Sequence, residues 1–278
     1  MTIAMEMDQT SQAELILHKA VHPPLSKRVQ GLGGVVVLAL VMGWIAVDLE
    51  LTPETFFRGL SRLGGFFSSM WPLSDGGDLQ RILYALAQTF AMAFAGTAVA
   101  AIISVPLGLL GAKTIVPFAP IHFAIRRVFD FFRGIPVLVW ALILVSAFGL
   151  GPFAGVVALA VADIPVLSKL YAEAFENIDP KQAEGLKASG AGPMASLRYA
   201  TLPQVLPVMA SQGLFYLESN FRNAAVLGIV GAGGIGFELE ERIKMFAFDQ
   251  VIFIILLYMI CVAILDTLSG RLRSNLIH

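Results

Sequence analysis

Long apolar stretches alternate with short polar segments along most of this chain. A bilayer's hydrocarbon core is about 30 Å thick, so a helix needs about 20 mostly apolar residues to cross it. Backbone groups in lipid must bond within their own segment, which favours helices. The stretches that meet these conditions lie near residues 30–48, 82–110, 135–150, 153–175, 204–230 and 251–269. The pattern therefore predicts an all-α, polytopic membrane helix bundle of about six transmembrane helices.

The stretches divide the chain into three predicted parts: a cytoplasmic N-terminal segment over 1–30, a first transmembrane helix with an external loop over 31–78, and a membrane core over 79–278. The first apolar run follows basic residues, as a secretory signal does, but bulky Trp44 and acidic Asp48 replace a small-residue cleavage site. We therefore expect an uncleaved anchor. The stretch at 135–150 is short unless the amphipathic segment Pro117 to Arg133 is counted with it.

The lysines and arginines set the expected orientation. Most of them fall in segments that the six spans place on one side, including Lys27, Arg28, Arg126 and Arg127. Basic loops stay on the cytoplasmic side of a membrane. Both termini are therefore expected to be cytoplasmic.

Composition supports a membrane protein and excludes several function classes. Hydrophobic residues make up 57% of the 278 and charged residues 14%, against about 45–50% and about 25% in soluble domains. Nineteen basic and twenty acidic residues leave no basic stripe for nucleic acid. Cys261 is the single cysteine, and the four histidines show no metal-ligand spacing. No phosphate-binding loop and no nucleophile with a base is recognisable. We therefore expect no metal, no cofactor bound by this chain, and no enzymatic activity.

The second span carries a ridge of small residues. Gly96, Ala100, Ser104 and Gly108 recur at every fourth position, which lets another helix backbone approach closely. Prolines near or within the spans delete helical hydrogen bonds and favour kinks. These features place the helix inside a bundle.

A polar stretch between the fourth and fifth spans, over 177–201, has the signals of two short helices. Asp179 and Pro180 are typical of a helix cap and first residue, and Gly190 to Pro193 predicts a stop. A second helix is expected from Met194 to Tyr199. The sequence thus predicts a helix-turn-helix that projects into the cytoplasm.

This stretch resembles the cytoplasmic loop of ABC importer permeases, whose pattern is E-A-A-x3-G-x9-I-x-L-P. Glu184, Gly190, Leu202 and Pro203 keep the spacing, whereas the two alanines and the isoleucine are replaced. In that family the loop forms the coupling helix that docks on the ATPase. The resemblance assigns ATPase coupling to Asp179, Ala183, Glu184, Gly185, Leu186, Ala188, Gly190, Ala191, Leu202 and Pro203.

From about Leu79 onward the chain is more narrowly similar to phosphonate-import permeases, most specifically from Asn220 to Gly236. Methionine-import permeases share a similar glycine-rich segment. The resemblance implies a second permease copy, two ATPase subunits that bind ATP and Mg, and a periplasmic or lipid-tethered solute-binding protein. It also implies the bacterial cytoplasmic (inner) membrane, with a small anionic solute of the phosphonate or phosphite type.

The glycine-rich segment also matches the dinucleotide fingerprint G-x-G-x-x-G. That fingerprint has meaning only between a strand and a helix, and here it ends a membrane helix at the predicted outer face. We therefore interpret it as a backbone turn or a closely packed outer gate, made by Gly231, Gly233, Gly234 and Gly236.

Ionisable and polar groups inside spans mark a pathway or a paired site, and the candidates are Asp163, Glu218, Asn220 and Arg222. Glu218 and Arg222 share a helix face and form either a structural pair or an anion-binding guanidinium. Asp163 either caps the kinked backbone before Pro165 or lines the pathway. Asp266 is expected to lie near Arg271 or Arg273.

Two other functions compete with an ABC importer subunit. A secondary transporter or channel would need an ion-coupling site, and many carry internal repeats; neither is clear in the sequence. A membrane enzyme would need a polar catalytic cluster, which is missing.

Overall fold

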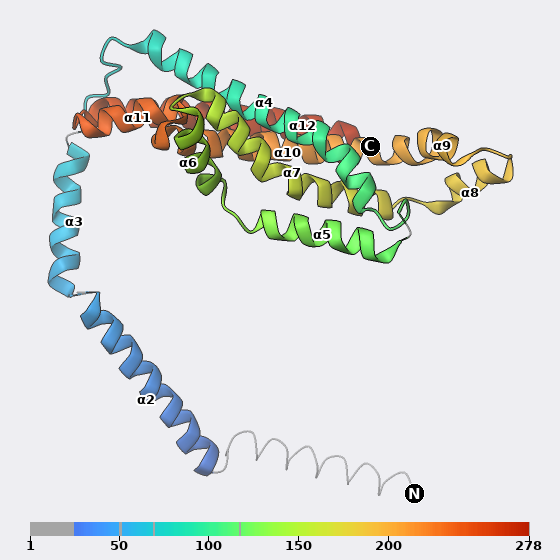
Figure 1. The fold of residues 1–278 in the computed structure, drawn as a ribbon. Coiled ribbons are helices and arrows are strands. Elements are labelled where there is room, and N and C mark those ends of the chain that lie inside the picture. The colour runs from blue at the N-terminus through green and yellow to red at the C-terminus, as the bar shows by residue number, and fades with distance from the viewer. Residues whose placement is uncertain (1–24, 50–51, 69, 117, 278) are drawn as a thin grey trace, which may run out of the picture. The chain divides into compact units, whose positions relative to one another are not determined.

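The computed structural model describes residues 25–49, 52–68, 70–116 and 118–277 (Figure 1). The chain divides into two compact units, Met1–Ser68 and Ser69–His278, ahead of the boundary predicted at 78–79. No strand occurs in these described residues. In chain order the helical elements are α2 (Leu25–Asp48), α3 (Pro53–Ser68), α4 (Leu79–Gly111), α5 (Ala119–Arg133), α6 (Val137–Phe148), α7 (Pro152–Glu176), α8 (Pro180–Ala188), α9 (Pro193–Ser196), the π-helical turn η1 (Leu197–Thr201), α10 (Leu202–Leu227), the π-helical turn η2 (Gly228–Ala232), α11 (Ile235–Lys244) and α12 (Phe248–Ile277).

The first unit contains α2 and α3. Helix α2 begins at Leu25, inside the predicted N-terminal segment 1–30, and the expectations for residues 1–24 lie outside the described residues. Its apolar side chains, such as Leu40 and Trp44, are exposed, as expected of a helix whose solvent is lipid. Helix α3 starts afresh at Pro53, where the Thr52 hydroxyl accepts a hydrogen bond from the backbone N–H of Thr55 (3.2 Å).

The second unit is built around the pair α4 and α7, which makes the most extensive helix contact. All four members of the predicted ridge are buried. A methyl group added at Gly96 would lie 2.8 Å from Cβ of Leu159, and one added at Gly108 would lie 2.8 Å from Cβ of Tyr171. The predicted close helix approach is confirmed, because only small residues on α4 leave room for the side chains of α7.

The third predicted span is bent. Helix α5 confirms the amphipathic lead-in, and α5 and α6 qualify as a span only together, with a bend of 80° at the break between them. Helix α6 itself covers only Val137–Phe148. Gly134 and Pro136 stand at this break, and proline removes the hydrogen bond that would continue a straight helix.

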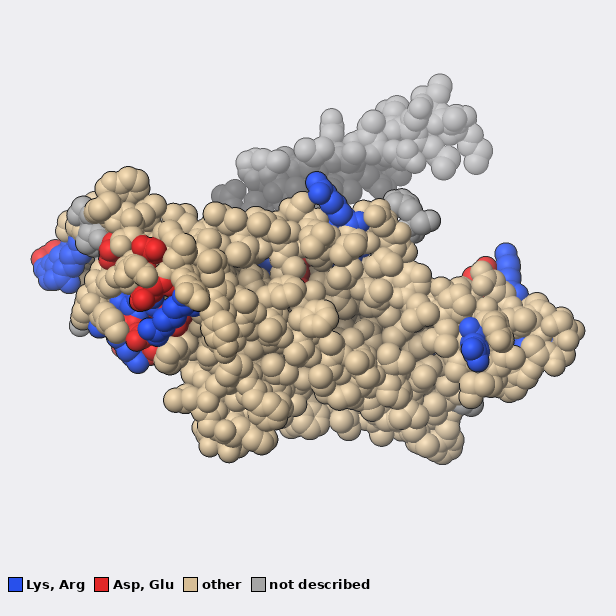
Figure 2. Space-filling view, turned by 90° about the horizontal axis from the view of Figure 1, so that it is seen from above, with Lys and Arg blue, Asp and Glu red and all other residues tan. Residues whose placement is uncertain are grey.

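Length and apolarity qualify α4, α7 and α12 as membrane spans, and the bent pair α5–α6 qualifies as a broken one. The apolar part of α2 described here, Gly33–Asp48, is shorter. Helix α10 is long enough, with 26 residues, but it includes the charged residues Glu218 and Arg222 and is not among these spans. In the view of Figure 2 charged side chains gather mainly at the two sides of the picture, and the surface between them is largely uncharged. This distribution fits a multi-pass membrane protein, while the number six stays a prediction.

Candidate functional site

The polar hairpin between α7 and α10 has the local structure that its sequence predicts. The Asp179 side chain accepts a hydrogen bond from the backbone N–H of Lys181 (3.0 Å), and Pro180 is the first helical residue. Gly190 has a φ of 85°, which favours glycine because a side chain there would be strained. Pro193 then starts α9, which continues through η1 into α10. The helix-turn-helix prediction is confirmed.

The hairpin projects from one end of the second unit (Figure 1). No residue of α8 is buried, and both Glu184 and Gly185 are exposed. Its base is tied down, since the backbone N–H of Asp179 donates to Oε1 of Gln204 (3.0 Å), while Ala200 and Thr201 are buried. An exposed helix on a fixed base can pass a partner's movement to α7 and α10.

A set of ion pairs near the hairpin holds the ends of α4, α5 and α7 together. The Glu176 carboxylate accepts from the backbone N–H of Lys113 (2.7 Å) and from Nη2 of Arg126 (2.8 Å). Lys169 donates to Asp130 (2.6 Å). Sequence reasoning missed this set, because the partners are 39 or more positions apart. Opposite charges at the predicted inner helix ends were the available signal.

Among the intramembrane candidates, Asp163 and Asn220 lie together. The Asn220 side-chain amide donates to the Asp163 carboxylate and to Oγ1 of Thr97 (2.9 Å for the latter). All three side chains are buried, and they come from α7, α10 and α4. This triad joins the three central helices within one subunit, because a polar group buried in lipid must find a hydrogen-bond partner.

Glu218 and Arg222 lie in a separate group against α12. Arg222 donates to Glu218 (2.9 Å) and faces Asp266 (3.4 Å), and Arg273 donates to the other oxygen of Glu218 (3.1 Å). Asp266, which was expected to lie near Arg271 or Arg273, forms its ion pair with Arg222. The rotation of α12 against α10 decides which arginine Asp266 meets. The Arg222 side chain remains 45% exposed.

The glycine-rich segment makes a tight turn that sequence reasoning anticipated. Gly231, Gly233 and Gly234 all have positive φ. The turn is fastened to other helices, because the backbone N–H of Gly234 donates to Gln88 (2.8 Å) and that of Ile235 donates to Thr89 (2.8 Å). The segment joins helix α10 to helix α11, so the strand that a dinucleotide site requires does not precede it.

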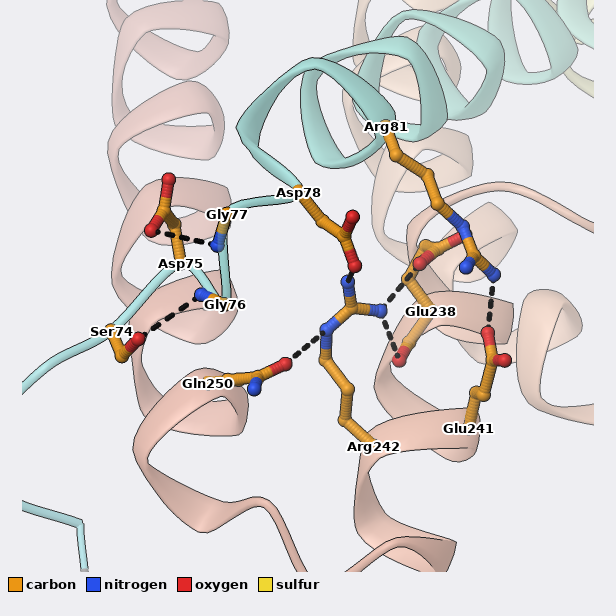
Figure 3. Close-up of polar contacts among 10 residues, drawn as sticks. All are labelled: Ser74, Asp75, Gly76, Gly77, Asp78, Arg81, Glu238, Glu241, Arg242 and Gln250. Atoms are coloured by element: carbon orange, nitrogen blue, oxygen red, sulfur yellow. Dashed lines mark hydrogen bonds and ion pairs between the residues drawn. The ribbon is translucent and has the colours of Figure 1, made fainter.

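A buried charge network lies beyond this turn, at the start of α4 and on α11 (Figure 3). Arg242 pairs with Glu238 and also faces Asp78 (3.5 Å), and Arg242 and Glu238 are 3% and 6% exposed. Arg81 donates to Glu238 (Nε to Oε1, 2.8 Å) and to Glu241. Sequence reasoning did not find this network, although Glu238 and Arg242 are four apart on one helix.

A further hydrogen bond extends this network to a third helix. Arg242 also donates to Gln250 (3.1 Å) at the start of α12. The network therefore links α4, α11 and α12 at one end of the unit.

Comparison with known proteins agrees with this architecture. Residues 104–277 match the family described as binding-protein-dependent transport system inner membrane component. The chain is 34% identical over 275 residues to the phosphate-import permease protein PhnE of Mycolicibacterium smegmatis, covering 98% of this chain and 51% of that protein. It thus spans about half the length of that relative. It is 35% identical to the phosphite transport system permease protein PtxC of Stutzerimonas stutzeri, over 87% of this chain and 86% of the relative.

Solved structures show the same fold. An inward-facing structure of the MetNI methionine ABC transporter gives a TM-score of 0.65 at 22% identity, and it covers 73% of this chain and 99% of the matched chain. An amino acid ABC transporter crystallised with histidines gives a TM-score of 0.60 at 17% identity.

A helical bundle with a protruding polar hairpin and a match over more than half the chain define the class: this chain belongs to the inner membrane component family of binding-protein-dependent transport systems. It is a multi-pass inner membrane component of a binding-protein-dependent transport system, and its named relatives are transport permease proteins, not enzymes.

Proposed function

We propose that this chain carries a small phosphorus oxyanion, of the phosphonate or phosphite type, through the inner membrane by alternating access. The relatives named for phosphate and phosphite support the solute class. The observation that carries the mechanism is the hairpin, whose helix α8 is exposed while its base is hydrogen-bonded to α10. A partner that grips α8 would move α7 and α10 together.

In the proposed assembly two permease copies form the pathway, and two ATPase subunits, which hold ATP and Mg, grip the two hairpins. A periplasmic or lipid-tethered solute-binding protein delivers the solute. ATP binding closes the ATPase pair and favours the outward-facing state, and hydrolysis returns the inward-facing state. Nucleotide drives the cycle only through its different affinity for the two states.

Within this proposal the ATPase contact includes Glu184 and Gly185, because both are exposed on α8. We expect that Glu184→Lys with Gly185→Leu will weaken ATPase binding by about 2 kcal/mol or more, which is about thirtyfold in affinity. The measurement is the amount of partner ATPase that co-purifies with tagged permease, together with ATP-dependent uptake.

A matched control is Glu240→Lys on α11, since it makes the same charge change at the other end of the unit. It should leave the co-purified ATPase unchanged. Undiminished ATPase binding by the hairpin variant would remove the coupling role. Uptake that continues without any ATPase would favour a secondary transporter.

The solute class is tested through the cognate solute-binding protein. Calorimetric titration with phosphite, methylphosphonate, phosphate and methionine should show tight binding of a phosphorus oxyanion alone. If the solute-binding protein bound methionine instead, the proposed solute class would be wrong.

The pathway role of Arg222 yields a separate expectation. Arg222 is half-exposed and faces two carboxylates, so its positive charge can be shared with a passing anion. Arg222→Lys is expected to keep more uptake than Arg222→Met, because lysine retains the charge but not the planar fork. Uptake rates are compared at equal amounts of assembled transporter. Equal uptake by wild type and both variants would leave only a structural pair with Glu218.

A further inference from the structure

Helix α3 presents one apolar face and one polar face. Phe56, Leu60 and Leu63 follow the spacing that places side chains on one side of a helix. Their exposed fractions are 68%, 53% and 47%. Ser61 and Arg62 lie on the opposite side by the same periodicity. The apolar face is thus left open within the described part of the chain.

Covalent geometry keeps α3 close to a membrane surface. Helix α2, the predicted first span, ends at Asp48, and α3 begins at Pro53. A chain extends at most about 3.3–3.6 Å per residue. A linker this short therefore cannot carry the start of α3 far from the end of α2. Thr52 and Pro53 begin a new helix at that place, and α3 cannot simply prolong the span.

The charges of α3 decide how it can lie. Its 16 residues include Glu54, Arg58 and Arg62, and such a helix is too short and too polar to cross a bilayer. Arg58 is paired with Glu54 at 2.5 Å on the helix surface. One acid and two arginines leave the polar side net positive, which suits the phosphate groups of lipids.

We propose that α3 lies in the plane of the membrane, at the outer face of the inner membrane, with Phe56, Leu60 and Leu63 inserted at the boundary between phospholipid headgroups and acyl chains. Arg58 and Arg62 then face headgroup phosphates and water. The partner is the phospholipid surface itself, because the same lipid that surrounds the exposed apolar side chains of α2 is within reach of α3.

The test measures the depth of single residues in the complete transporter. The full chain, with Cys261→Ala as background, is assembled with its partner subunits in liposomes of phosphatidylethanolamine and phosphatidylglycerol. Single cysteines replace Leu60, Leu63, Ser61 or Arg62 and receive a nitroxide label. Collision with oxygen, which enters lipid, is compared with collision with a water-soluble nickel chelate. All four native residues are exposed, so the substitutions remove no buried contact.

Labels at 60 and 63 are expected to collide mainly with oxygen, at a depth of about 5–10 Å, and labels at 61 and 62 mainly with nickel. Nickel access at all four positions would overturn the proposal, since the apolar face would then be in water. Protection of 60 and 63 from both reagents would also overturn it, because protein would then cover that face. The readout needs neither solute nor ATP turnover, so it can fail while the proposed transport function stands.

Discussion

Replacing Gly236 with alanine is expected to prevent the permease from accumulating as a folded protein. A methyl group at this position would lie 1.8 Å from the carbonyl oxygen of Ala225 and 2.9 Å from Cα of Gly228. These neighbours are backbone atoms, so the turn between α10 and α11 would have to open. Overpacking usually costs about 1–3 kcal/mol, and a contact this short places Gly236→Ala above that range.

The variant is measured by its thermal midpoint in detergent and by the yield of assembled transporter. Gly213→Ala is the matched control, because Gly213 lies on α10 and an added methyl group there meets no atom within 4 Å apart from the adjoining backbone of its own helix. We expect the control to accumulate like the wild type. A Gly236→Ala protein with an unchanged midpoint would show that the two helix ends do not approach as described.

Removing the charge of Arg242 is expected to destabilise the protein strongly. Arg242 is 3% exposed and pairs with Glu238, which is 6% exposed. Breaking a buried ion pair by removing one partner costs about 3–5 kcal/mol. The loss of folding stability in Arg242→Met should fall near the lower end of this range, because Glu238 keeps its second partner, Arg81.

Lys244→Met on the same helix provides the comparison. Lys244 also pairs with an acid four residues before it, Glu240, but the lysine side chain is 71% exposed. Exposed pairs contribute about 0–1 kcal/mol, so the midpoint of Lys244→Met should stay near that of the wild type. Similar shifts for Lys244→Met and Arg242→Met would mean that the network of Figure 3 is open to water.

The hairpin could be predicted from the sequence because its signals are local. A capping aspartate, a proline at the first helical position and a glycine with positive φ each act within a few residues. The ridge on α4 could also be predicted, because a four-residue repeat of small side chains is visible without knowing the partner helix. The sequence did not indicate that this partner is α7.

The charge pairings could not be predicted in the same way. Arg81 and Glu238 are 157 positions apart, and nothing near either residue indicates the other. The ion pair of Asp266 was missed for the same reason: Arg271 and Arg273 are near in sequence, but α10 brings Arg222 to Asp266. Pairing across helices depends on the rotation and approach of whole elements.

The sequence by itself determined that this chain needs lipid as its solvent, where its helices can form, and where a polar hairpin interrupts them, since hydrophobicity, caps and breakers act over short distances. Only the tertiary structure decided the triad around Asn220 and the buried network around Arg242. These features depend on how side chains from distant segments fill one volume and satisfy one another's charges, which no local pattern records.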